Sequence, residues 1–227
     1  MSMPNYVPAE QWMKDKADYA RKGIARGRAM VGLTFADGVL LVAENHSRTL
    51  HKVSEIYDRI AFAGVGKYNE FDQLRIAGIR MADIQGYQFS REDVDVRSLA
   101  NRYAQMLGHV FTHEPKPLEV EILIAEIGVS GDPDDDRLFH ILYDGTVMDE
   151  ENYSVLGGDA EAISGRMKEK YASGASRPDA LKAAMTALSG PDRTLARKEL
   201  EVAELHRNNG RRAFRRIEGD ELDALLA

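Results

Sequence analysis

The stretch that decides the fold covers residues 26–45 and reads RGRAMVGLTFADGVLLVAEN. Two apolar runs flank the pair Asp37-Gly38, and such a pair between apolar runs is a strong signal for a β-hairpin with a tight turn. Both runs are almost continuously apolar, which predicts strands of a sheet that is covered on both faces. The hairpin ends in a carboxylate, Glu44, and Lys52 follows one short loop later.

A helix is predicted ahead of this hairpin, over residues 9–25, with Gly27 as its stop signal. Its apolar residues recur at helical spacing and form one stripe: Met13, Ala17, Ala20 and Ile24. Trp12 adds a large apolar side chain at the start of the helix, and charged residues fill most other positions. Because the stripe is narrow, we expect the helix to be an extension that packs on the rest of the fold.

Beyond the hairpin, short strands and paired helices alternate along the chain. Strands are predicted near residues 52–56, 59–65, 120–127, 138–143, 153–156, 200–205 and 212–217, and helical patterns over 71–82 and 99–110, from Asp159, from Ser176 and at the C-terminal end. A break between the first two of these helices is expected from Gly86 to Ser90.

Tight turns between strands indicate antiparallel pairing, and helices that arrive in pairs indicate one helical layer over each of two sheets. The predicted fold is of the α+β class, a four-layer α/β/β/α sandwich with an N-terminal extension helix. We expect one domain over residues 1–227, with a tail (1–8), the helical segment (9–27) and the sandwich (28–227).

Composition restricts the class of protein. The chain has 227 residues, of which 44% are hydrophobic and 30% charged, and its formal net charge of −7 argues against general nucleic-acid binding. It has no cysteine, which is typical of a reducing compartment. No signal peptide and no apolar run of membrane-spanning length are visible, so a cytoplasmic protein is expected that binds neither nucleic acid nor membrane.

Two segments resemble ligand-binding motifs, a phosphate-binding loop and a calcium-binding loop, but each lacks residues that its motif requires. The run Gly64–Lys67 follows a predicted strand, but a phosphate-binding loop needs glycine where Ala61 stands and serine or threonine where Tyr68 stands. The aspartates of residues 132–136 resemble the start of a calcium loop, but Arg137 stands where that loop needs glycine. No cofactor and no metal are therefore expected.

A basic segment near the C-terminal end has two interpretations. Four arginines, Arg211, Arg212, Arg215 and Arg216, surround Phe214. In an acidic chain they fit an edge strand that charge protects from aggregation, or a surface for an acidic protein partner.

The opening hairpin is typical of sandwiches whose hydrolase members use the first residue of the mature chain as nucleophile. Several segments, in order and with matching spacing, carry a closer resemblance: ARKGIARGR (20–28), DGVLLVAEN (37–45), LHKVSEIYDRI (50–60), GKYNEFDQLR (66–75), YDGTVMDE (143–150) and RRAFRRI (211–217). Over nearly its full length the chain resembles proteasome α subunits of the actinobacterial kind, which are non-catalytic members of the N-terminal-nucleophile hydrolase fold.

The nucleophile that such hydrolases need is missing. Alignment with the first strand of a catalytic β subunit places Ala29, or Arg28 within one residue of register, where threonine stands. Neither residue has a hydroxyl group, and an internal position offers a peptide nitrogen instead of a free amine. Glu44 and Lys52 would then remain from the catalytic frame, the carboxylate and lysine that lie beside the nucleophile in a catalytic subunit. We expect helix 9–25 to fill the end of the sandwich where the active-site cleft of such a subunit would open.

The resemblance implies a non-catalytic subunit that forms heptameric α rings and caps rings of catalytic β subunits. It also implies that a ring ATPase docks on the α ring and delivers proteins that carry a ubiquitin-like tag. Two rival functions are a self-processing amidase or peptidase, which the missing nucleophile disfavours, and a stand-alone binding module.

The residues implied for these tasks form three groups. The pocket for the C-terminal tail of the ATPase involves Lys52, which matches the pocket lysine of the family, with Gly66 and Lys67 as further wall residues. The gate is expected in the tail of residues Ser2, Met3, Pro4, Asn5, Tyr6, Val7 and Pro8. Ring assembly is assigned to Trp12, Met13, Ala17, Ala20 and Ile24.

Overall fold

A computed structural model describes residues 8–226 and contains two five-stranded antiparallel sheets. The first has the order β10-β9-β2-β1-β8 and is built from β1 (Met30–Phe35), β2 (Gly38–Glu44), β8 (Tyr153–Leu156), β9 (Leu200–His206) and β10 (Phe214–Arg216). The second has the order β3-β4-β5-β6-β7 and is built from β3 (Val53–Tyr57), β4 (Ile60–Gly66), β5 (Val120–Glu126), β6 (Arg137–Ile141) and β7 (Val147–Glu150).

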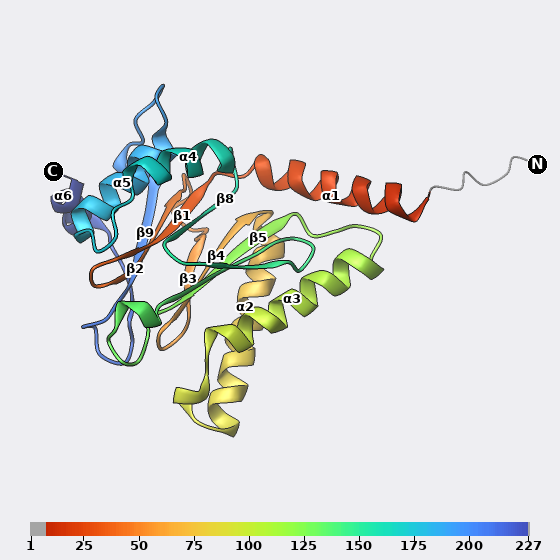
Figure 1. Ribbon diagram of the computed structural model, residues 1–227, viewed down its shortest axis with the longest axis horizontal. Coiled ribbons are helices and arrows are strands. Elements are labelled where there is room, and N and C mark those ends of the chain that lie inside the picture. Colours follow the sequence, from red (N-terminus) through yellow and green to blue (C-terminus); the bar gives the residue numbers. More distant parts are fainter. Residues whose placement is uncertain (1–7, 227) are drawn as a thin grey trace, which may run out of the picture.

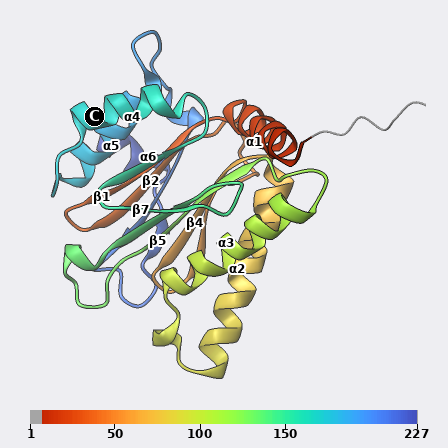
Figure 2. The ribbon, with the colours of Figure 1, turned by 45° about the vertical axis from the view of Figure 1, so that its right-hand side comes forward.

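Helices cover the outer face of each sheet, and four layers result (Figures 1 and 2). The second sheet is covered by α2 (Tyr68–Gln88) and α3 (Val96–His113), and the first by α4 (Ala160–Lys170) and α5 (Arg177–Ser189), beside which α6 (Gly219–Leu226) packs. Helix α1 (Ala9–Ala25) extends from the body of the sandwich (Figure 1). The predicted sandwich with an N-terminal helix is confirmed.

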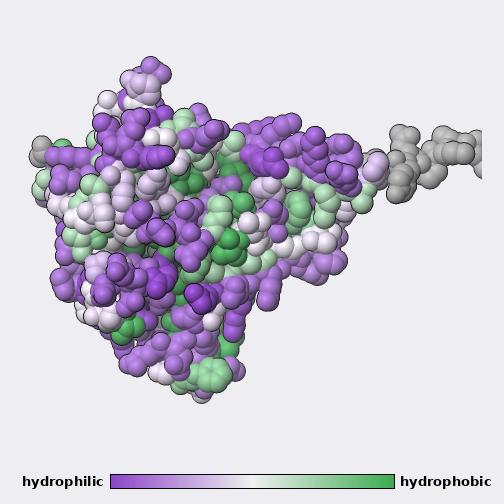
Figure 3. All heavy atoms as spheres, in the orientation of Figure 1, coloured by the Kyte–Doolittle hydropathy of each residue, from purple (hydrophilic) through white to green (hydrophobic). Residues whose placement is uncertain are grey.

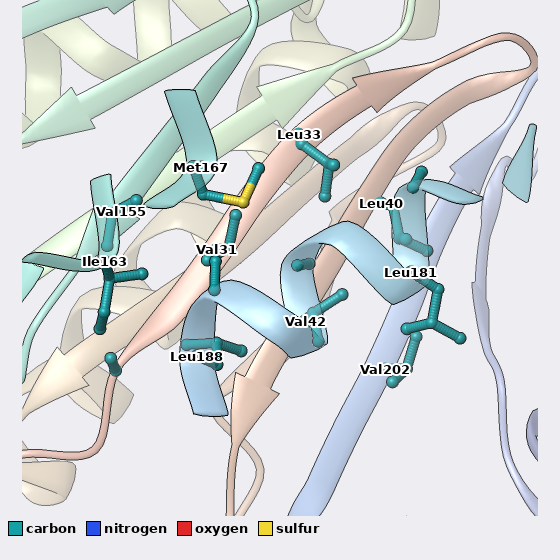
Figure 4. Packing of buried hydrophobic residues seen from close by; sticks show 14 of the residues in the cluster. Val31, Leu33, Leu40, Val42, Val155, Ile163, Met167, Leu181, Leu188 and Val202 are labelled. Carbon is teal, nitrogen blue, oxygen red and sulfur yellow. The ribbon is translucent and has the colours of Figure 1, made fainter. Parts of the chain in front are cut away.

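Three apolar clusters hold the layers together. One lies between the first sheet and α4 and α5, where Val31, Leu40 and Val42 meet Met167 and Leu181 (Figure 4). A second lies under α2 and α3, and a third fills the space between the sheets. The sheets approach closely at Gly32, where a Cβ atom would lie 2.3 Å from the side chain of Leu123.

The hairpin of residues 30–44 forms as predicted. β1 and β2 pair from Met30–Ala43 to Phe35–Gly38. Gly38 has a φ of +147°, and a Cβ atom there would lie 2.0 Å from the carbonyl oxygen of Leu205 on β9. The turn therefore requires glycine for its backbone conformation and for its contact with the neighbouring strand.

Two sequence expectations need correction. The break between the first pair of helices begins at Phe89 and not at Gly86, because α2 continues to Gln88. Gly86 serves close packing instead, since a Cβ atom there would lie 2.1 Å from the hydroxyl of Tyr57. The second correction is β7, which was not predicted because its residues are half-buried or exposed and show no strong alternation.

The basic segment is an edge strand, as one of its two interpretations expected. Its arginines are largely used inside the chain: Arg212 pairs with Glu55, Arg215 with Glu204 and Glu221, and Arg216 with Glu201. The side chains of Arg211 and Arg212 remain 76% and 72% exposed, and the second interpretation, a surface for an acidic protein partner, stays a prediction. No helix within residues 8–226 is long and apolar enough to cross a membrane.

Candidate functional site

Arg28 lies at the head of the first strand, beside both residues of the expected frame. Its guanidinium Nη1 lies 2.5 Å from Oε1 of Glu44, and its carbonyl oxygen accepts a hydrogen bond from Lys52 Nζ. The methyl group of Ala29 is buried in the apolar cluster under α4 and α5. Of the two residues considered for the nucleophile position, the geometry therefore selects Arg28.

Glu44 is held as a carboxylate between two guanidinium groups. Its side chain is 4% exposed, and Arg193 donates to it at 3.0 and 2.6 Å in addition to Arg28. Burial acts to raise the pKa of Glu44, but the hydrogen bonds from Arg193 and Arg28 outweigh burial and lower the pKa to about 2. A carboxylate this acidic and this fully paired is unsuited to take a proton at neutral pH.

Lys52 lies directly before β3, with its ammonium group under the head of β1. Nζ donates to the carbonyl oxygen of Arg28 at 2.5 Å. Burial lowers the pKa of Lys52 to about 8, although Glu201 and Glu44 act in the opposite direction. At neutral pH the side chain is therefore mainly cationic, and one of its three N–H donors faces a backbone oxygen.

Glu201 is a residue of this site that sequence reasoning missed. It lies on β9 with its side chain 8% exposed, and it accepts hydrogen bonds from the backbone N–H groups of Lys52 (2.8 Å) and Val53 (3.1 Å). Asn45 and Arg216 also donate to it. Glu201 thus fixes the backbone that carries Lys52, and its sequence signal was weak, because the same strand contains a second acidic residue, Glu204.

A cleft of about 450 Å³ opens over this frame. Four arginines line it, namely Arg26, Arg28, Arg166 and Arg193, together with the end of α5, the following residues 190–192 and the start of α4. No residue of α1 lines the cleft. The expectation that helix 9–25 fills this end is therefore wrong: the ion pairs of Glu44 occupy the frame, while α1 turns away toward the other sheet.

Gly66 lies at the same end of the sandwich as the frame. Its φ is +104°, and a Cβ atom there would lie 2.0 Å from the carbonyl oxygen of Glu119, so the position requires glycine. Lys67 is half-exposed, with Nζ 3.7 Å from Glu70 and 4.0 Å from Glu119. Lys52 is joined to the same strand, because its carbonyl accepts from Gly64 N–H.

Sequence comparison with known proteins identifies the family of the chain. The family model described as "Proteasome subunit" matches residues 24–204. The chain belongs to the proteasome subunit family. It is similar to proteins named "Proteasome subunit alpha" from Acidimicrobium ferrooxidans, with 61% identity covering 100% of this chain and 97% of the relative, and from Thermomonospora curvata, with 55% identity covering 100% and 99%. A third, from Thermobifida fusca, is 53% identical over 100% of this chain and 91% of the relative.

Similarity to proteasome α subunits confirms the prediction of a non-catalytic subunit. The frame of the family is present, with Glu44 and Lys52 in contact with one residue at the head of β1. That residue, Arg28, has no nucleophilic atom and is joined to the chain on both sides, so the arrangement cannot perform the attack that a terminal threonine performs.

In this proteasome-family chain, α1 is anchored by a residue that the predicted stripe did not include. Lys16 is 4% exposed, and its ammonium group donates to the carbonyl oxygens of Phe111 (2.9 Å) and Glu114 (2.6 Å) at the C-terminal end of α3. A cation at this end of a helix stabilises unpaired carbonyls and the helix dipole. The ammonium also lies 3.7 Å from the ring centre of Trp12.

The predicted stripe is buried only in part. Ala20 and Ile24 are buried against Tyr143, Met13 and Ala17 are half-buried, and Trp12 is 42% exposed. Figure 3 shows hydrophilic side chains along the outer side of α1 and paler or apolar ones on the side toward α3. Of the expected gate, Pro8 accepts a hydrogen bond from Trp12 N–H, and residues 2–7 lie outside the described residues.

Proposed function

We propose that the chain forms the outer α ring of a 20S-type proteasome, with copies of itself as neighbours and a catalytic β subunit as partner. The observation that carries this proposal is Arg28, which stands in an intact frame where a peptidase needs a nucleophile. A self-processing amidase or peptidase would need serine, threonine or cysteine there. Membership of the family makes a stand-alone binding module the weaker alternative.

Ring assembly is assigned to α1. Its inner side is engaged by its own chain through Lys16, Ala20 and Ile24. Trp12 lies beside Lys16 on this side and is 42% exposed, and Tyr19, seven residues further along the helix, is 50% exposed. Large aromatic side chains that are half-exposed on a projecting helix are suited to the surface of a second copy.

The surface around Lys52 is proposed as the docking pocket for the C-terminal tail of a ring ATPase. A terminal carboxylate needs a cation with unused hydrogen-bond donors. Lys52 meets this need, because the carbonyl of Arg28 takes one N–H donor and leaves the others for a ligand. Gly66 and Lys67 lie at the same end of the sandwich and complete the proposed wall.

The gate is assigned to residues Ser2 to Pro8, which would converge at the axis of a ring. The proteins that pass it would be substrates that carry a ubiquitin-like tag, in the cytoplasm. These assignments rest on the sequence and on the family, and they extend the role of an α subunit to control of entry.

Native mass spectrometry of the full chain, alone and with the cognate β subunit, tests the assembly. We expect heptameric rings and mixed α/β complexes. A monomer of 25.3 kDa under both conditions would overturn the proposal. Deletion of residues 1–25 should abolish rings and leave a folded but aggregation-prone monomer, whereas full α/β complexes from the truncated chain would exclude α1 as the assembly element.

A further inference from the structure

A second cleft lies where the two sheets end at their edge strands, β7 and β8. Its volume is about 640 Å³, a size typical of ligand sites. The lining residues come from β6, from β7 and β8 with the turn between them, and from the start of α4. None of them belongs to the frame around Glu44 and Lys52.

Two polar side chains of this cleft are deeply buried: Ser154 is 2% and His140 6% exposed. Ser154 Oγ has no hydrogen-bond partner among residues 8–226, and His140 Nε2 makes no well-aligned hydrogen bond there, although the Glu121 carboxylate lies 3.4 Å away. Burying a polar group without a hydrogen bond is unfavourable, so such a group calls for a partner such as a bound water molecule, an ion or a ligand.

Strand pairing shows that both side chains face the space between the sheets. Ser154 lies opposite Gly32 in the first sheet, and His140 lies opposite Leu123 in the second. Gly32 and the side chain of Leu123 approach each other across the sheets. Because directly paired residues share a face, Ser154 and His140 lie on the two facing walls at the edge of the inter-sheet space.

The mouth of the cleft is acidic. Four carboxylates line it, from Asp149, Glu150, Glu151 and Glu161. No lysine or arginine lines the cleft, and none within residues 8–226 forms an ion pair with these four carboxylates. A fifth carboxylate, from Glu121, lies behind the base with Oε2 3.4 Å from His140 Nε2. Arg137 lines a neighbouring cleft together with Asp149, Glu150 and Glu151 but is not in ion-pair contact with them.

We propose that this cleft binds the alkylammonium groups of a diamine or polyamine. An ammonium group donates up to three hydrogen bonds and accepts none. The hydroxyl of Ser154 can accept at the base, and the carboxylates at the mouth stabilise further positive charge. A chain with two or more amines can meet both sets of groups at once.

Two other chemistries fit this cleft less well. No group of three histidine, aspartate or glutamate side chains within residues 8–226 is arranged to hold a metal ion. A serine–histidine pair for nucleophilic catalysis would require a hydrogen bond to the serine hydroxyl, and Ser154 Oγ makes none within the described part of the chain.

Calorimetric titration of the full-length protein with spermidine tests the proposal at low and at physiological salt. Two variants alter the cleft: Glu150→Gln with Glu161→Gln at the mouth, and Ser154→Ala at the base. The matched control is Glu92→Gln with Asp93→Asn, which removes the same charge from the exposed segment between α2 and α3. Thermal unfolding of each variant verifies that it is folded.

We expect saturable binding with one site per chain, weakened about tenfold or more in both cleft variants and unchanged in the control. The proposal would be overturned if spermidine bound the wild type and the cleft variants equally, or if its binding did not saturate. It would also be overturned if Mg²⁺, added as a competitor, displaced spermidine as effectively as a second polyamine does. A second titration with N-acetyl-lysine methylamide separates two sources of the same group. Binding of spermidine alone indicates a free polyamine, and comparable binding of the lysine compound indicates a protein lysine.

Discussion

Replacing Glu44 by glutamine should destabilise the protein although it removes no catalytic group. The substitution keeps the size of the side chain and removes the charge that Arg28 and Arg193 share. A carboxyl pKa that falls from 4.5 to about 2 on folding corresponds to about 3 kcal/mol of stability at neutral pH. The two arginine side chains are 47% and 51% exposed and can rehydrate, so we expect a loss of about 2–3 kcal/mol.

The pH dependence of this loss has a definite sign. Because folding lowers the pKa of Glu44, its contribution is fully present above pH 4.5 and disappears as pH falls toward about 2. Urea unfolding at pH 7 and pH 3 should therefore show a difference between wild type and variant that falls by more than half at the lower pH. At pH 7 the melting temperature should fall by about 5–10 °C.

A surface pair provides the control for this experiment. Glu55 pairs with Arg212 at 2.6 Å, but the Arg212 side chain is 72% exposed, so Glu55→Gln should cost less than about 1 kcal/mol. The reasoning fails if Glu44→Gln costs no more than Glu55→Gln at pH 7, or if its effect is the same at pH 3.

Three further predictions concern docking, anchoring and gating. Lys52→Ala should weaken binding of the ATPase tail about ten- to a hundredfold while the yield of the α/β complex is maintained. Docking on the wild type should weaken as pH rises through about 8, because Lys52 then loses its charge. Equal ATPase-stimulated degradation by Lys52→Ala and by Lys182→Ala, a control at an exposed residue, would refute the pocket. Lys16→Met should leave two carbonyls of α3 unpaired and speed amide hydrogen exchange in α1; unchanged exchange would show that the lysine does not anchor the helix. Removing residues 2–8 should speed hydrolysis of long peptides by the α/β complex severalfold, with a smaller effect on tripeptide-sized substrates; unchanged rates for both would place the gate elsewhere.

The layers of this fold could be predicted from the sequence because their signals are local. Apolar periodicity, the Asp37-Gly38 turn and the Ser176 helix cap each depend on residues a few positions apart. The serine cap is observed, with Ser176 Oγ accepting from Asp179 N–H. The absence of a hydroxyl at residues 28 and 29 was likewise visible without a structure, and it carried the prediction of a non-catalytic subunit.

The partners of the site were decided by the tertiary structure. Arg193 neutralises Glu44 from 149 positions away, and Glu201 holds the Lys52 backbone over the same separation. Lys16 anchors α1 to carbonyls about a hundred residues later in the chain. Such pairs depend on strand order and on which helix end meets which layer, and a local pattern contains neither. For the same reason the cleft of His140 and Ser154 became visible only when two sheet edges, from different parts of the chain, were placed face to face.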